Sequence, residues 1–199
     1  MTLGLRERKK LATRQALAAA ALRLAAERGV DAVTVEDIAA AADVSARTFF
    51  NHFATKEEAF VADDLERAKE LLDRLHEEPA DVDLWSTLVR LMGEHLEHAG
   101  SFDRREALAQ HAVRTSPAVL TQQILQYAGL EADLVAEIAR RTGQPATGLQ
   151  PRLLAAALVA ALRTAVETWV EGSNDPSPRR LFETAAAQLA PAFPTSKKD

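Results

Sequence analysis

Thr34–Lys56, with the sequence TVEDIAAAADVSARTFFNHFATK, carries the signals of two short helices joined by a sharp turn. Thr34 is a good helix N-cap, and Asp37 three positions later can return the hydrogen bond, which predicts a helix from about Val35. Asp43 suits a tight turn, and Val44 is placed to pack between the helices. Ser45 is a second N-cap. The stretch therefore predicts a helix-turn-helix.

The second of these helices divides into an apolar face and a polar face. Phe49 and Phe53 are four residues apart and so lie on the same side, where we expect them to be core. The rest of its surface carries polar side chains, from Arg47, Thr48, Asn51 and His52. This division is typical of a helix that lies in a DNA groove, and Arg47 is the best candidate for contact with a guanine edge.

The segments TVEDIA, VSARTFFNHF and TKEEAF are contiguous and correctly spaced, and they resemble the N-terminal domain of TetR-type bacterial transcription regulators. The resemblance covers about the first 60 residues, and the rest matches only in its helical character. The TFFNHF variant and the later WVEG segment are more similar to actinobacterial members grouped with mycofactocin-type regulators, some of which sense acyl-CoA-like ligands.

The resemblance implies a set of DNA-facing residues: Thr34, Ser45, Ala46, Arg47, Thr48, Phe50, Asn51, His52 and Lys56. Thr48 and His52 are expected to donate to phosphates. Lys56 would combine its charge with the N-terminus of the next helix. Phe50 departs from the family pattern, in which a tyrosine hydroxyl bonds a phosphate, so it can provide apolar contact only.

The charge is unevenly divided along the chain. The net charge is -5, yet residues 1–56 hold nine of the 24 lysines and arginines and only six of the 29 acidic residues. A basic run near the N-terminus, Arg6, Arg8, Lys9, Lys10 and Arg14, can follow a phosphate backbone. The alternative is that this run is a solvated, frayed terminus. The acidic remainder is expected to stay off DNA.

Composition excludes several classes of protein. The chain has 199 residues, 47% of them hydrophobic, and no cysteine, which excludes disulfides, thiolate catalysis and cysteine-ligated metals. The N-terminus lacks an apolar signal region, and no uninterrupted apolar stretch reaches about 18 residues. We therefore expect a soluble, cytoplasmic protein with no membrane partner.

Helical spacing and breakers predict an all-α fold of about nine helices, with no strand. Further helices are expected over 6–28, ended by Gly29; from Thr55, with Glu58 in a capping box, toward Leu75; and over 84–100, 118–141, 151–171 and 178–189. We expect a helix-turn-helix domain over 1–54, a helical ligand-binding and dimerisation bundle over 55–192, and a flexible tail over 193–199.

One such module covers only half of a DNA site, so we expect a homodimer on a pseudo-palindromic operator. The last two helices carry apolar stripes suited to an interface: Leu154, Leu158, Ala161, Leu162 and Ala165, then Leu181, Phe182, Ala185 and Leu189. Burial of the stripes inside one subunit is the alternative. The family resemblance favours a four-helix dimer interface.

A ligand site is expected in the middle helices, although ordinary core is the commoner meaning of such residues. The candidates are Trp85, Leu88, Met92, His95, Phe102, His111, Ile124 and Tyr127. Arg114 joins His95, His111 and Tyr127 as a possible partner of a polar head group. An apolar or acyl-CoA-like effector would move the fourth helix and release the DNA.

Enzyme motifs are absent from the sequence: there is no glycine-rich nucleotide loop and no G-x-S-x-G. His95 and His98 have a spacing that can bind metal but lack a clear third ligand, so we predict no metal and no cofactor. The expected function is a ligand-responsive DNA-binding repressor. The alternatives are a ligand-independent DNA-binding protein and a metabolite-binding protein or enzyme with a degenerate DNA-binding module.

Overall fold

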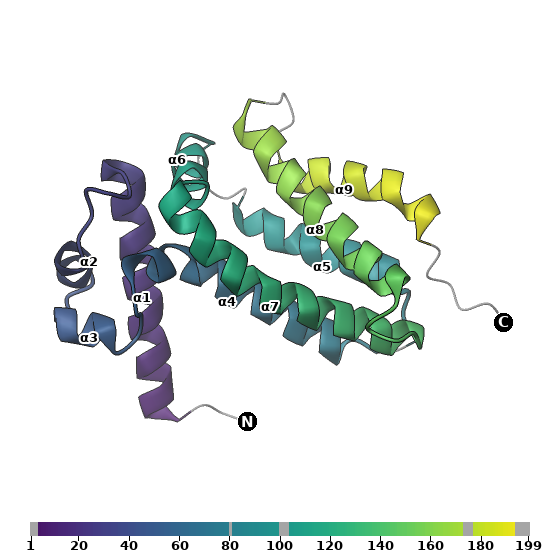
Figure 1. Ribbon diagram of the computed structural model, residues 1–199, viewed down its shortest axis with the longest axis horizontal. Coiled ribbons are helices and arrows are strands. Elements are labelled where there is room, and N and C mark those ends of the chain that lie inside the picture. Colours follow the sequence, from purple (N-terminus) through teal and green to yellow (C-terminus); the bar gives the residue numbers. More distant parts are fainter. Residues whose placement is uncertain (1–3, 80, 100–103, 173–176, 194–199) are drawn as a thin grey trace. The chain divides into compact units, whose positions relative to one another are not determined.

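The structure, a computed structural model, describes residues 4–79, 81–99, 104–172 and 177–193 (Figure 1). Over these residues it contains nine α-helices, one short 3-10 helix and no strand, which confirms the all-helical prediction. The chain packs as two compact units. The first comprises Met1–Glu66 and Leu108–Gln126, and the second comprises Arg67–Ala107 and Tyr127–Asp199.

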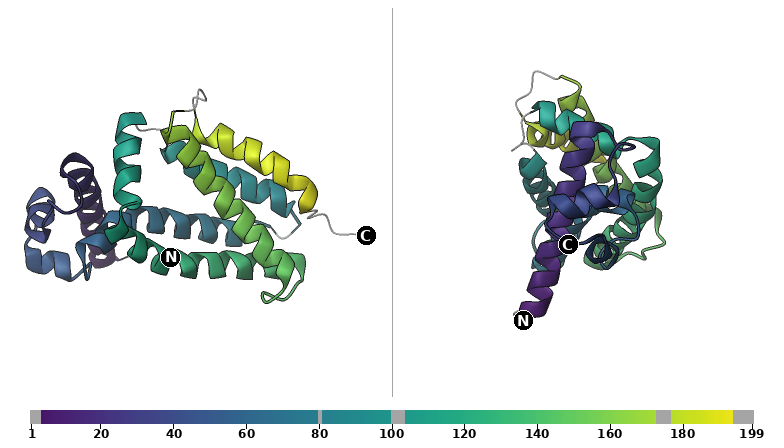
Figure 2. Two further views of the ribbon diagram at one scale, coloured as in Figure 1. Left: turned by 45° about the horizontal axis from the view of Figure 1, so that its top comes forward. Right: turned by 90° about the vertical axis from the view of Figure 1, so that its left-hand side faces the viewer.

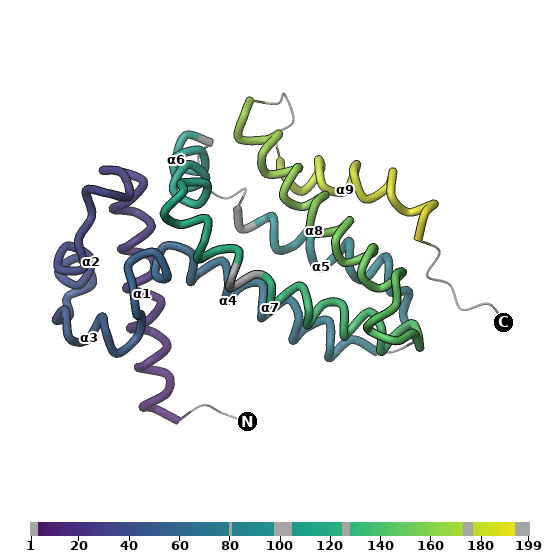
Figure 3. The backbone as a smooth tube through the Cα atoms, viewed as in Figure 1, coloured from purple at the N-terminus to yellow at the C-terminus, as the bar shows by residue number. Residues whose placement is uncertain are grey.

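The first unit is built around three N-terminal helices, whose path Figure 3 traces. It contains α1 (Leu5–Arg28), α2 (Val35–Ala41), α3 (Ala46–Phe50), the start of α4 (Lys56–Glu77), the end of α6 (Arg104–Arg114) and the start of α7 (Pro117–Thr142). The predicted helix-turn-helix is therefore present as α2 and α3.

Local capping explains where these helices begin and end. The Thr34 N–H donates to the Asp37 carboxylate over 3.0 Å and the Asp37 N–H donates to the Thr34 hydroxyl over 3.1 Å, so the predicted capping box is confirmed. The Ser45 hydroxyl accepts from the Thr48 N–H over 3.1 Å. Asp43 turns the chain in the left-handed region at φ 55°, and Gly29 follows α1 at φ 86°.

A core of aromatic and aliphatic side chains holds the first unit together. Phe49 and Phe53 are buried in it, as predicted, and their ring centroids are 5.5 Å apart. Phe60 and Val61 of α4 join the same core, because they lie on the buried side of its first turns. This packing is why the first part of α4 belongs with the helix-turn-helix, although we expected the functional division at residue 54.

The second unit contains α5 (Leu84–Ala99), α8 (Leu149–Val170), α9 (Pro178–Leu189) and the remaining parts of α4 and α7. Helix α9 packs against both α8 and α5, as the left view of Figure 2 shows. The observed bounds of these helices lie within two residues of those predicted. Helix α6 had no predicted range of its own, since few apolar positions mark it.

The stripes predicted for the dimer interface lie in the core of the second unit. Leu154, Leu158, Ala161, Ala165 and Phe182 are buried there, and Leu162, Leu181, Ala185 and Leu189 pack partly buried against them. The five buried side chains are covered by helices of their own chain, which is the alternative that the periodicity left open, whereas the four partly buried ones keep some exposed surface.

Helix α8 has the length and composition of a membrane span, with a mean hydropathy of 1.6, although only 39% of its apolar window is buried. A core helix that also carries an apolar outer face meets the same criterion. At the end of the described chain, Phe193 stacks on Trp85 with ring centroids 6.1 Å apart. Phe193 is thus held by packing, and residues 194–199 of the predicted tail lie outside the described residues.

Candidate nucleic-acid interface

Helix α3 presents a mixed surface to its surroundings. Ser45, Arg47, Phe50 and Asn51 are exposed, and Arg47 and Asn51 are four residues apart on one side of the helix. Ala46, Thr48 and His52 are half-buried. The chain therefore offers one guanidinium, one amide and one aromatic ring from a helix that the Phe49 and Phe53 side chains anchor from behind.

All three of the predicted DNA-facing hydroxyls, those of Thr34, Ser45 and Thr48, already have partners. The Thr34 hydroxyl donates to the Asp37 carboxylate over 2.6 Å, and this bond, together with the Thr34 N–H, lowers the pKa of Asp37. The hydroxyls of Ser45 and Thr48 lie 2.9 Å apart. A phosphate contact by Thr34 would have to replace a hydrogen bond that holds the start of α2.

Arg14 belongs to the basic run in sequence, but its side chain makes contacts within the first unit. Its guanidinium donates to the carbonyl of His52, lies over the Phe53 ring at 4.1 Å, and pairs with Glu58 at 3.6 Å and Glu66 at 3.9 Å. Arg14 precedes buried Leu17 by one helical turn, which is the signal that could have placed it on the inner side of α1. It joins the end of the α3 segment to α4, and the phosphate role predicted for it has to compete with these contacts.

His52 is held in an environment that disfavours its charge. Burial, and then the charges of Arg14 and Lys10, lower the pKa of its imidazole. Its Nδ1 is buried without a hydrogen-bond partner among the described residues. A neutral imidazole has one N–H, so His52 would offer a phosphate a hydrogen bond but no positive charge.

Lys56 also has an internal role. Its ammonium donates to the carbonyls of Val30 over 3.0 Å and Val33 over 2.8 Å, which lie in the loop between α1 and α2. The ammonium has three N–H groups, so at most one is left for a phosphate. The N-terminus of α4 keeps its own capacity to attract an anion.

We predict that Lys56→Met lowers the free energy of unfolding by about 1.5–3 kcal/mol, the size of a lost hydrogen bond to a charged group, because two part-buried carbonyls lose their donor. Urea unfolding followed by circular dichroism measures this. Lys9→Met, at an exposed lysine of α1, is the matched control and should change little. Equal stability of the two variants would show that Lys56 does not hold the loop.

The residues predicted to bind ligand lie in both units. Leu88 and Met92 are buried in the core of the second unit, and Trp85 and His95 are half-buried there. In the first unit, His111 is half-buried and Ile124 is 61% exposed. Phe102 and the side chain of Tyr127 lie outside the described residues.

Arg114, expected to face a ligand head group, is paired within the first unit. Its guanidinium forms an ion pair with Asp64 of α4, with one N–H 3.2 Å from the carboxylate, and a second contact reaches Gln110 at 3.4 Å. This charge is therefore balanced by a partner on α4. Among the described residues, no group of three possible ligands is placed to hold a metal ion.

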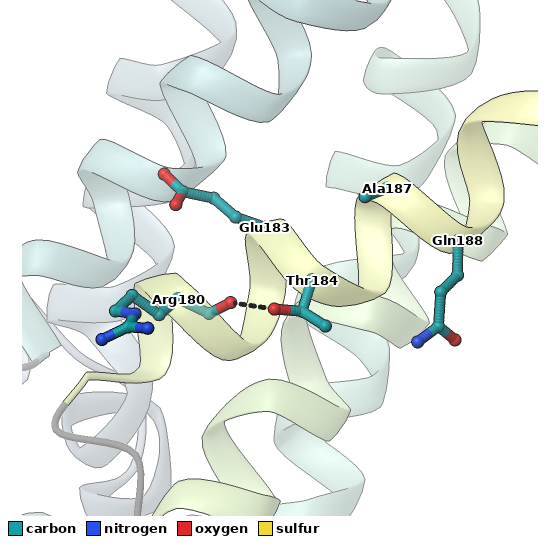
Figure 4. A pocket seen from close by; sticks show the side chains of 5 residues that line it. All are labelled: Arg180, Glu183, Thr184, Ala187 and Gln188. Carbon is teal, nitrogen blue, oxygen red and sulfur yellow. Dashed lines mark hydrogen bonds between the residues drawn. The ribbon is translucent and has the colours of Figure 1, made fainter.

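A hollow of about 530 Å³ lies on the outer face of α9 (Figure 4). It is lined by Arg180, Glu183, Thr184, Ala187 and Gln188. The Thr184 hydroxyl donates to the carbonyl of Arg180 over 2.8 Å, an ordinary helix contact that Figure 4 draws dashed. None of the predicted ligand residues lines this hollow.

Two family profiles of known proteins match this chain. The family profile "Bacterial regulatory proteins, tetR family" matches residues 17–62, and the profile "MftR C-terminal domain" matches residues 100–194. The chain belongs to the TetR family. It is a DNA-binding transcriptional regulator, and its C-terminal region matches the MftR-type domain, as the sequence indicated.

Individual relatives agree with this membership. The HTH-type transcriptional regulator TcmR of Streptomyces glaucescens is 53% identical over 55 residues, which is 28% of this chain and 24% of TcmR. MftR of Mycobacterium tuberculosis (strain ATCC 25618 / H37Rv), named for regulation of mycofactocin biosynthesis, is 25% identical over 84% of both chains. The chain thus spans about a quarter of the first relative and most of the second.

Solved structures show the same fold. The FadR regulator of Bacillus subtilis, in complex with stearoyl-CoA, is 19% identical over 88% of this chain and 96% of its own, with a TM-score of 0.63. At this identity the likeness concerns the arrangement of the helices and leaves the ligand of this TetR-family chain open.

Proposed function

We propose that this TetR-family chain is a cytoplasmic, homodimeric repressor without enzymatic activity, and that a small molecule releases it from a pseudo-palindromic operator. The main support for the proposal is that α3 has one buried side and one exposed polar side. Arg47 and Asn51 are exposed on a helix whose opposite side is fixed by Phe49, and whose start is capped by Ser45. A rigid helix with exposed polar side chains is what reading base edges requires.

For the dimer, we propose the outward face of α8 as the central contact. Leu149, Leu153 and Val159 are 74%, 49% and 39% exposed, and the small residues Ala156 and Ala160 lie among them. Such a face favours close approach of a second copy about a two-fold axis. The polar hollow on α9 would then form part of the rim.

For the effector, we propose an apolar or acyl-CoA-like molecule. The MftR-type C-terminal region and the stearoyl-CoA complex of a protein with the same fold support this class. Leu88, Met92, Trp85 and the other candidates remain predictions, and the buried ones would have to repack around a ligand. The route from effector to DNA would run through α4, which Arg114 contacts at Asp64 and Arg14 contacts at Glu58 and Glu66.

The test is titration of the protein onto DNA from upstream of its own gene at fixed salt, with scrambled DNA beside it. We predict that Arg47→Ala weakens binding to the operator by about 10- to 100-fold, the value of one good contact to a base edge, and leaves the weak binding to scrambled DNA almost unchanged. The exposed Arg23 of α1 provides the matched control, Arg23→Ala, for which we expect no change.

Weak binding to every DNA sequence would contradict the proposal and favour the degenerate-module alternative. Specific binding that no acyl-CoA of any chain length changes would favour a ligand-independent DNA-binding protein or a different effector class. A ligand that binds equally well to both states cannot release DNA, so ligand affinity alone decides nothing. The operator affinity with and without ligand is the quantity to compare.

A further inference from the structure

Phe50 is unlike the other aromatic residues of α3. Its side chain is 58% exposed, whereas Phe49 and Phe53 beside it are 0% and 2% exposed. An isolated exposed apolar side chain is common on protein surfaces and needs no explanation by itself. This one lies on the helix that carries Arg47 and Asn51, so it would be buried whenever the helix enters a DNA groove.

The ring of Phe50 already has a supporting contact before any DNA arrives. It packs edge-on against the Phe49 ring, with centroids 5.5 Å apart and an angle of 88° between the planes. Phe49 is itself fully buried in the core of the first unit. Because the ring is supported from below, little side-chain freedom would be lost when it contacts a second surface.

The neighbours of Phe50 place it among groups suited to base contact. Arg47 is three positions earlier and Ala46 is four positions earlier, so both adjoin it on the helix surface. Arg47 is exposed and Ala46 is half-buried, which leaves an apolar ring beside a guanidinium. A phenyl ring has no donor or acceptor for a phosphate oxygen or a polar base edge. The apolar group that the major groove does offer is the 5-methyl group of thymine.

We propose that Phe50 reads a thymine in each half-site through its 5-methyl group, next to the base that Arg47 contacts. The inference rests on the proposed role of α3 in reading DNA. Removal of one methyl from a buried contact corresponds to a change of about 3- to 10-fold in affinity. Phe50 thereby sets specificity at one position and adds no phosphate contact.

The experiment begins with operator DNA selected by the wild-type protein from a random library of duplexes. Each thymine of the selected site is then replaced in turn by deoxyuridine, which removes the methyl group and keeps the base pair. Affinity is measured at fixed salt for the wild type, Phe50→Ala and Phe50→Leu. Thermal unfolding of both variants shows whether the fold is retained.

We expect one thymine per half-site at which deoxyuridine weakens wild-type binding by about 3- to 10-fold. At that thymine the substitution should have no further effect on Phe50→Ala, and a reduced effect on Phe50→Leu, which keeps an apolar side chain. Effects at the other thymines should be the same in all three proteins. This pattern in a double-substitution cycle would establish the contact.

Other outcomes would overturn the inference, and they distinguish failure of the Phe50 contact from failure of the proposed DNA-binding function. If the wild type selects a specific site but no deoxyuridine effect depends on residue 50, the helix reads DNA and Phe50 does not read a methyl. A selected site without a thymine near the base that Arg47 contacts has the same meaning. If no specific site is selected at all, the proposed DNA-binding function fails, and this inference fails with it.

Discussion

Replacement of Arg141 by methionine should lower the free energy of unfolding by about 3 kcal/mol, since it breaks a buried ion pair from one side. The Arg141 side chain is 2% exposed and that of Glu137 is 9% exposed. Its guanidinium donates to the Glu137 carboxylate over 2.8 Å and to three backbone carbonyls, Leu75, Glu78 and Pro79, at the end of α4. These bonds tie the end of α4 to α7 within the second unit.

The neighbouring arginine supplies the control. Arg140 also donates to Glu137, over 2.9 Å, but its side chain is 47% exposed, so Arg140→Met should cost about 1 kcal/mol or less. Denaturation by urea, followed by circular dichroism, compares the two variants. Equal losses of stability would contradict the assignment of Arg141 as the residue that holds α4 to α7.

The pH dependence of stability gives a second test of the contacts around Glu137. Hydrogen bonds from Arg140, Arg141 and His76 outweigh burial and lower the pKa of Glu137 from 4.5 to about 2. Because the folded pKa is the lower one, the carboxylate stabilises the fold above about pH 4.5, and this contribution is lost as the pH falls toward 2. The difference in stability between the wild type and Arg141→Met should therefore shrink over that interval. The free energy of unfolding of Glu137→Gln should fall less over the same pH interval than that of the wild type.

The features that the sequence predicted well are those whose signals are local. Capping at Thr34 and Ser45, the turn at Asp43 and the stop at Gly29 each depend on residues within one helical turn, and all four are present. The separation of α3 into a buried and an exposed side followed from the spacing of its phenylalanines.

The roles of the cationic residues could not be predicted in the same way. The basic run and Lys56 suggested phosphate contacts. Instead, Arg14 donates to a backbone carbonyl 38 positions away in the sequence, and Lys56 donates to carbonyls at most 26 positions away. Arg141 donates to a carbonyl 66 positions away. Every residue carries a carbonyl, so such a partner leaves no mark in the sequence. The stripe at Leu154 and Leu158 was ambiguous for another reason, because periodicity shows that a face is buried and not which chain covers it.

Arg14→Met should weaken binding to the operator by about 10-fold or more while the fold is retained, because the end of the α3 segment loses its link to α4. A hydrogen bond from a charged donor contributes about 1.5–3 kcal/mol, and a cation over an aromatic ring about 0.5–1 kcal/mol. In this chain both come from one guanidinium, which bonds the His52 carbonyl and lies 4.1 Å above Phe53. Met keeps the apolar stem and removes the charge.

The salt dependence of affinity separates this positioning role from a direct phosphate contact. A lost phosphate contact lowers the slope of log affinity against log salt by about 0.9, whereas a misplaced α3 leaves the number of contacts and the slope nearly unchanged. We therefore expect Arg14→Met to weaken specific binding at an unchanged slope. Arg8→Met, on the exposed part of α1, should weaken binding to all DNA with a smaller slope if the basic run follows the backbone. A reduced slope in Arg14→Met would mean that Arg14 leaves Glu58 and Glu66 and binds the DNA itself.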